Sequence, residues 1–178
     1  MSDILSQWRR AHKTVPLTSA EHRFAWVAGL FLIFTSWAVG TMHLWSQSVA
    51  LVLAIATVAA VPTGSEGWRG QGRQLVRQPV FWLGIAWLLY ALIGALNPLA
   101  TYVREGNRWW MVFREPIRWL PTSVDVPLSV GGPWQTLIIH AGVIIFGLAV
   151  WLAARRRRLG RALLMTLALN GLVLAAIG

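Results

Sequence analysis

Five apolar runs limit what this chain can fold into more than any other feature. They cover about residues 24–40, 46–61, 79–97, 134–154 and 162–178, and short polar or basic segments separate them. A helix of about 17–25 apolar residues spans the hydrocarbon core of a bilayer. Hydrophobic residues make up 56% of the chain, which excludes a disordered chain and disfavours a soluble domain. We therefore predict an all-α, polytopic membrane helix bundle of about five transmembrane helices.

The residues at the helix ends support these spans. Thr18-Ser19-Ala20-Glu21 fits a capping box, in which threonine and glutamate satisfy the first free backbone N–H groups of a helix. Pro79 stands at the first position of the third run, where its missing N–H costs nothing. The second run, residues 46–61, is short, and the sequence leaves open where its helix begins and ends. Residues 1–23 form a cytoplasmic basic tail, either as an amphipathic surface helix or as an unstructured segment.

The basic residues indicate the orientation. The chain has sixteen Lys and Arg against six acidic residues, and twelve of the sixteen lie in the N-terminal tail, the second loop and the last loop. The other four lie in the loop 99–132. Cytoplasmic loops carry the excess of positive charge, so we predict a cytoplasmic N-terminus, a transmembrane domain over 24–178 and an external loop over 99–132. Charges placed beside a membrane favour lipid partners and disfavour nucleic acid.

The external loop holds the candidate binding residues. Guanidinium groups match phosphate and carboxylate oxygens, and indole rings stack on the apolar faces of sugars, so this mixture suits an anionic glycan or a phosphorylated lipid headgroup. The alternative is a loop that lies on the outer leaflet, with its aromatic residues in lipid. Three prolines forbid a long helix and favour turns and extended pieces. The candidate residues are Arg104, Arg108, Trp109, Trp110, Arg114, Arg118 and Trp119.

No catalytic residue, metal site or cofactor is predicted. The chain has no cysteine, which excludes disulfides, thiolate metal sites and a cysteine nucleophile, and it has no phosphate-binding glycine loop or HExxH sequence. A haem held by His43 and His140 is an alternative, since both lie toward the outer face. The expected role of His140, as of Asn97 and Asn170, is a hydrogen bond at a helix contact.

The C-terminal run ends at Leu174-Ala175-Ala176-Ile177-Gly178 without a polar or aromatic anchor. Membrane helices normally end in such anchoring residues. We therefore expect a chain cut short, and the alternative is a natural terminus that just reaches the outer interface.

The second half of the chain resembles a known family. From about residue 90 to 178 it is similar to the N-terminal part of bacterial O-antigen ligase and polymerase-like membrane proteins. The blocks that carry the resemblance are Tyr90-Ala91-Leu92-Ile93-Gly94-Ala95-Leu96-Asn97-Pro98, Arg108-Trp109-Trp110, Trp119-Leu120-Pro121-Thr122-Ser123-Val124-Asp125, Pro133-Trp134, Arg161-Ala162-Leu163-Leu164 and Asn170-Gly171.

The resemblance implies an activity. Such proteins are metal-independent glycosyltransferases of the bacterial inner membrane that transfer a glycan from a polyprenyl pyrophosphate carrier to an acceptor outside the cytoplasmic membrane. They have roughly a dozen spans, and a later periplasmic loop supplies the catalytic residues. This chain would be an N-terminal fragment without that loop, and its partners would be the carrier-linked glycan and the remaining helices of the parent chain. The alternative is a small non-catalytic membrane protein that binds a partner helix or lipid.

Overall fold

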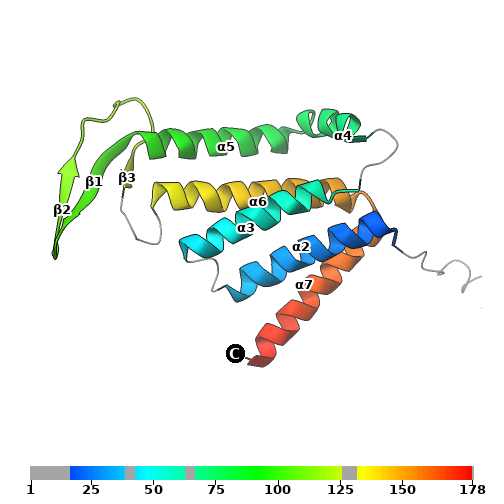
Figure 1. The fold of residues 1–178 in the computed structure, drawn as a ribbon. Coiled ribbons are helices and arrows are strands. Elements are labelled where there is room, and N and C mark those ends of the chain that lie inside the picture. Colours follow the sequence, from blue (N-terminus) through cyan, green and yellow to red (C-terminus); the bar gives the residue numbers. More distant parts are fainter. Residues whose placement is uncertain (1–16, 39–42, 63–66, 126–131, 178) are drawn as a thin grey trace, which may run out of the picture.

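The computed structural model describes residues 17–38, 43–62, 67–125 and 132–177. Most of the predicted tail 1–23 lies outside these ranges. The described part is mostly helical (Figure 1), and its helices are α2 (Ser19–Trp37), α3 (Leu44–Ala59), α4 (Gly67–Val76), α5 (Pro79–Leu96), α6 (Pro133–Ala154) and α7 (Arg157–Ile177).

The predicted start signals are confirmed at two helices. The Thr18 hydroxyl accepts a hydrogen bond from the Glu21 backbone N–H at 3.3 Å, and the Glu21 carboxylate accepts one from the Thr18 N–H at 2.9 Å. Both halves of the capping box are therefore present at α2. Pro79 begins α5. Both helix starts are therefore determined by side chains at the first few residues of the helix.

Three helices in the described ranges are long and apolar enough to cross a membrane, namely α5, α6 and α7. Of the about five spans predicted, three are therefore supported. Helix α3 is apolar but has only 16 residues, and α2 begins with a polar turn. Helix α7 starts at Arg157 rather than at Ala162 as predicted. Arginine is a good helix former whose long side chain can reach water, so Arg157, Arg158 and Arg161 are part of α7.

The all-α prediction is wrong for the segment between α5 and α6. It contains the strands β1 (Pro98–Glu105), β2 (Arg108–Phe113) and β3 (Ser123–Asp125) in the order β2-β1-β3. Strands β1 and β2 are antiparallel, and β1 and β3 are parallel. The cause is local: β-branched and aromatic residues favour strands, and Gly106 takes a positive φ of 60° in the two-residue turn. The expectation of extended pieces in this loop is confirmed.

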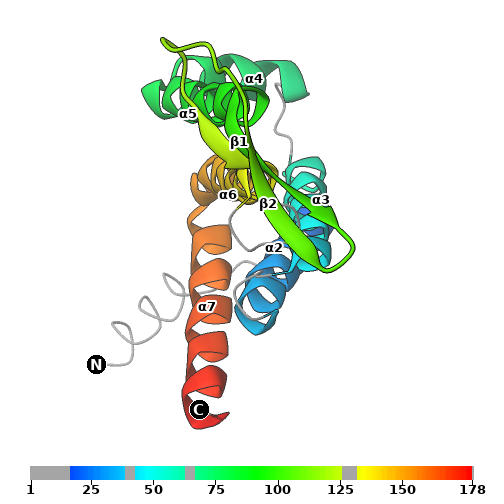
Figure 2. The same cartoon turned by 90° about the vertical axis from the view of Figure 1, so that its left-hand side faces the viewer.

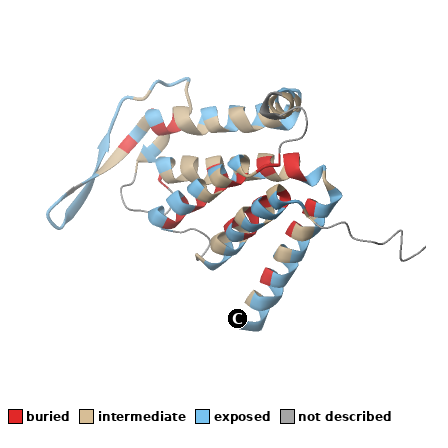
Figure 3. Ribbon diagram, turned by 45° about the vertical axis from the view of Figure 1, so that its right-hand side comes forward, coloured by how far each residue is buried: buried red, intermediate tan, exposed pale blue. Residues whose placement is uncertain are grey.

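Buried residues gather where α2, α3 and α6 meet and at the start of α7 (Figure 3). Phe31 of α2 stacks on Phe146 of α6 with ring centroids 4.0 Å apart. Small residues such as Ala54 and Ala149 are fully buried, which lets the helix backbones approach closely, as is usual in membrane bundles. Helix α5 contributes few buried residues and lies against α6.

The two ends of the bundle differ in character. Helices α2 and α7 start at the end where α4 lies, and the sheet lies at the opposite end (Figure 1). At the α4 end the Arg156 guanidinium donates to the Glu21 carboxylate at 3.1 Å. The Thr18 backbone N–H, and then Arg156, lower the pKa of Glu21 below its ordinary value of 4.5, against a desolvation effect that raises it.

Candidate functional site

The candidate residues lie on a hairpin and a turn that extend beyond the helix ends. Figure 2 views the molecule from this end, with β1 and β2 in front of the helices. Every residue of β2 is exposed. The strand leaves the bundle because Leu96 ends α5 at Asn97-Pro98, where proline prevents continuation of the helix.

The register of β1 and β2 divides the candidates between two faces. Residues opposite each other in a sheet share a face. Arg104 is opposite Trp109, and Met111 and Phe113 follow on that face. Arg108 is opposite Glu105, and Trp110 and Val112 follow on the other face. The hairpin therefore presents Trp109 on one face, and Arg108 and Trp110 on the other.

A separate turn carries the other candidates. Arg118 and Trp119 stand between Ile117 and Leu120, whose backbones are joined by a hydrogen bond of 3.0 Å. Trp119 is 82% exposed. Arg114 follows β2 directly, and its backbone N–H donates to the Leu99 carbonyl at 2.9 Å. Its side chain is exposed, as is that of Arg118.

One buried side chain holds this turn to the bundle. The Asn97 amide nitrogen donates to the carbonyls of Ile117 at 3.2 Å and Pro121 at 3.1 Å, and its amide oxygen accepts from the Ile117 N–H at 2.9 Å. Asn97 is 8% exposed. The Ser123 hydroxyl adds a bond of 2.7 Å to the Gly94 carbonyl. The end of α5 thus fixes the described residues 114–125, which include the short strand β3.

The predicted helix contact of Asn97 is therefore wrong, because its side chain binds the backbone of the loop and not another helix. Asn170 does make the expected contact between helices: its amide oxygen accepts from the Trp37 indole N–H at 2.9 Å, which joins α7 to α2. Sequence reasoning also missed the hairpin. Its signal was Gly106-Asn107 between two runs of β-branched and aromatic residues.

His140 has partners within the helices. Its Nδ1 lies 2.6 Å from the Thr136 carbonyl oxygen, so Nδ1 carries the proton and donates. Its ring lies 5.5 Å from the Trp87 ring of α5. His43 precedes α3 as its N-terminal cap residue. The hydrogen bond of His140 fits the expected role of a polar residue at a helix contact.

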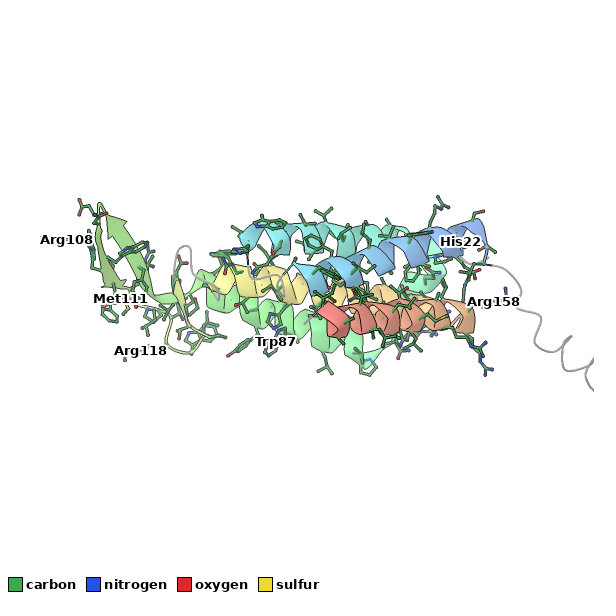
Figure 4. All side chains as sticks on the ribbon, turned by 90° about the horizontal axis from the view of Figure 1, so that it is seen from below. His22, Trp87, Arg108, Met111, Arg118 and Arg158 are labelled. Carbon is green, nitrogen blue, oxygen red and sulfur yellow. The ribbon has the colours of Figure 1, made fainter. Side chains whose placement is uncertain are left out.

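Figure 4 shows how the charges are distributed along the bundle. Arg108 and Arg118 lie at the sheet end, and His22 and Arg158 lie at the opposite end. Glu105 stands opposite Arg108, and Glu115 follows Arg114. The chemistry that the exposed arginines themselves offer is binding. Guanidinium groups bind phosphate oxygens through paired hydrogen bonds, and exposed indoles offer flat apolar surfaces.

No family model, no curated protein and no solved structure matches this chain significantly.

Proposed function

We propose that this chain is the N-terminal membrane segment of an O-antigen ligase-like glycosyltransferase. In this proposal its hairpin and turn bind a polyprenyl pyrophosphate-linked glycan at the periplasmic face of a bacterial inner membrane. The observation that carries the proposal is that three exposed arginines and three exposed indoles lie together at the sheet end, namely Arg108, Arg114, Arg118, Trp109, Trp110 and Trp119. The other described basic clusters begin α7 or lie in and after α4.

The chemistry of the proposed ligand fits these side chains. A diphosphate carries negative charge on several oxygens, which arginine can neutralise without a metal ion. The apolar faces of a sugar stack on indole rings such as those of Trp110 and Trp119. The residues of this segment bind and orient the carrier, and the transfer reaction belongs to groups supplied elsewhere in the parent protein.

The proposal includes five spans, with α2 and α3 completing the set, and a cytoplasmic N-terminus. Because the chain has no cysteine, a single introduced cysteine is the sole thiol that a maleimide can label, and its accessibility reports the orientation. Asn107→Cys lies in the hairpin turn and spares the positive φ of Gly106. Gly72→Cys lies in α4, where an added Cβ meets nothing within 4 Å.

We expect a membrane-impermeant maleimide to label Asn107→Cys in intact spheroplasts and to label Gly72→Cys only after the membrane is opened. The reason is that the basic segment 63–78 stays on the cytoplasmic side. The reverse pattern would invert the orientation and remove the periplasmic site.

A matched pair of triple variants tests ligand binding. Arg108→Gln, Arg114→Gln and Arg118→Gln together remove three exposed charges from the sheet end. We expect this variant to bind a short-chain polyprenyl pyrophosphate at least about tenfold more weakly, because each cation near a phosphate contributes about 1 kcal/mol. The affinity is measured by titrating the purified full chain in detergent with this ligand and monitoring binding by thermophoresis.

The control is Arg73→Gln, Arg77→Gln and Arg161→Gln, which removes the same charge from exposed positions at the α4 end. It should leave the affinity within about twofold of the original. Equal weakening in both triple variants would mean that net charge alone attracts the ligand. Equal affinity of the unmodified chain for the carrier and for phosphatidylglycerol would support the non-catalytic lipid-binding alternative instead.

A further inference from the structure

A groove between α2 and α7 forms a second surface, separate from the sheet. Its volume is about 680 Å³, within the range of about 300–1,000 Å³ typical of ligand sites. The lining is mainly apolar, with Trp26 and Ile33 from α2 and Leu169 and Val173 from α7. These side chains are 42% to 77% exposed, so the groove is open along its length.

Two contacts between the helices shape the groove. In its middle the helices approach closely, because a Cβ added to Gly29 would lie 3.4 Å from a methyl carbon of Thr166. At its far end the Trp37 indole N–H donates to the Asn170 amide oxygen at 2.9 Å. Trp37 stands fifteen positions after His22 on α2, which corresponds to about 22 Å. One leaflet of hydrocarbon is about 15 Å thick, so a lipid acyl chain fits along the groove.

The end of the groove opposite Trp37, which we call its mouth, is basic. Ala162 and Arg158 stand four and eight residues before Thr166 on α7, so Arg158 heads the helix face that lines the groove. His22 heads the matching face of α2. Both side chains are exposed, and Figure 4 shows them at the same end of the bundle. The mouth therefore suits a negatively charged group attached to an apolar chain.

We propose that this groove binds an anionic glycerophospholipid, with one acyl chain between α2 and α7 and its phosphate at Arg158 and His22. This lipid site goes beyond the glycan function proposed above and does not depend on it. A second copy of the chain is a poorer occupant. Each copy carries a net charge of +10, and pairing would bring basic mouths together. The nearby carboxylate, Glu21, is already paired with Arg156.

Two single variants test the two parts of the site. Leu169→Trp fills the groove from an exposed position, and Arg158→Gln removes a charge from the mouth. Native mass spectrometry of the purified full chain, incubated with equal amounts of phosphatidylglycerol and phosphatidylcholine, measures the lipid that stays bound. We expect the original chain to retain phosphatidylglycerol preferentially. Retention should fall roughly fivefold in Arg158→Gln, because one cation near a headgroup contributes about that factor, and at least as much in Leu169→Trp.

The matched controls are Leu164→Trp, which adds the same bulk at an exposed position outside the groove, and Arg73→Gln, which removes a charge from an exposed position in α4. Both should retain phosphatidylglycerol as the original chain does. Equal retention of the two lipids, or equal losses in Leu169→Trp and Leu164→Trp, would overturn the proposal. A dimer that Leu169→Trp dissociates would instead assign the groove to a second copy.

Discussion

Replacing Asn97 by alanine is expected to release the turn that carries Arg118 and Trp119 while leaving the helices folded. The substitution removes three hydrogen bonds to loop backbone, each contributing about 1 kcal/mol. The local free energy of opening should therefore fall by about 3 kcal/mol, which corresponds to roughly 100-fold faster amide exchange at Ile117. Hydrogen–deuterium exchange in detergent micelles measures this rate.

Asn170→Ala is the matched control, because Asn170 is equally buried at 8% exposure but contacts Trp37 far from the turn. It should leave exchange at Ile117 unchanged. If Asn97→Ala also leaves that exchange unchanged, the strands rather than the asparagine hold the turn. If the turn is released, carrier binding by Arg118 should weaken as well, which links the fold of this segment to its proposed function.

Glu21→Ala should destabilise the α4 end of the bundle. The change removes one half of the capping box and the ion pair with Arg156. The cap contributes about 1 kcal/mol, and the pair contributes up to about 1 kcal/mol because Arg156 is partly solvated. We expect the melting temperature in detergent to fall by roughly 5 °C. Glu21→Gln keeps a side-chain oxygen for the Thr18 N–H and should lose about half as much. Equal losses in both variants would show that the cap contributes nothing.

The same residue predicts a dependence on pH. The pKa of Glu21 is lower in the folded chain than its ordinary value of 4.5. The stabilisation is therefore fully present above about pH 4.5 and disappears as the pH falls through the folded pKa. Melting temperatures of the original chain should converge on those of Glu21→Gln below that range. A difference between them that stays constant until the chain unfolds in acid would contradict the assignment.

Much of the helical structure could be predicted because each signal is local. The Thr18 and Glu21 capping box and Pro79 specify helix starts through atoms a few residues apart. Apolar runs specify α5 and α6 almost to the residue. The start of α7 differs from the prediction because a basic cluster ends an apolar run without ending the helix, since arginine is a good helix former. The hairpin was missed because Gly106-Asn107 was not weighed as a turn.

The candidate residues were found from composition, and their arrangement was not. Sequence placed four arginines and three tryptophans in one loop, but only the strand register shows that Trp109 and Trp110 lie on opposite faces. The burial of Asn97 and its bonds to Ile117 and Pro121 also depend on residues 20 or more positions away. No local pattern encodes such a distance.

The sequence alone predicts helices over the apolar runs and the starts of α2 and α5, because these depend on side chains within a turn or two of one another. The pairing of α2 with α7, and the groove between them with His22 at one end, become visible only in the fold. The physical reason is that helix pairing depends on close packing of small residues, such as Gly29 against Thr166, between surfaces that are more than a hundred residues apart in the chain.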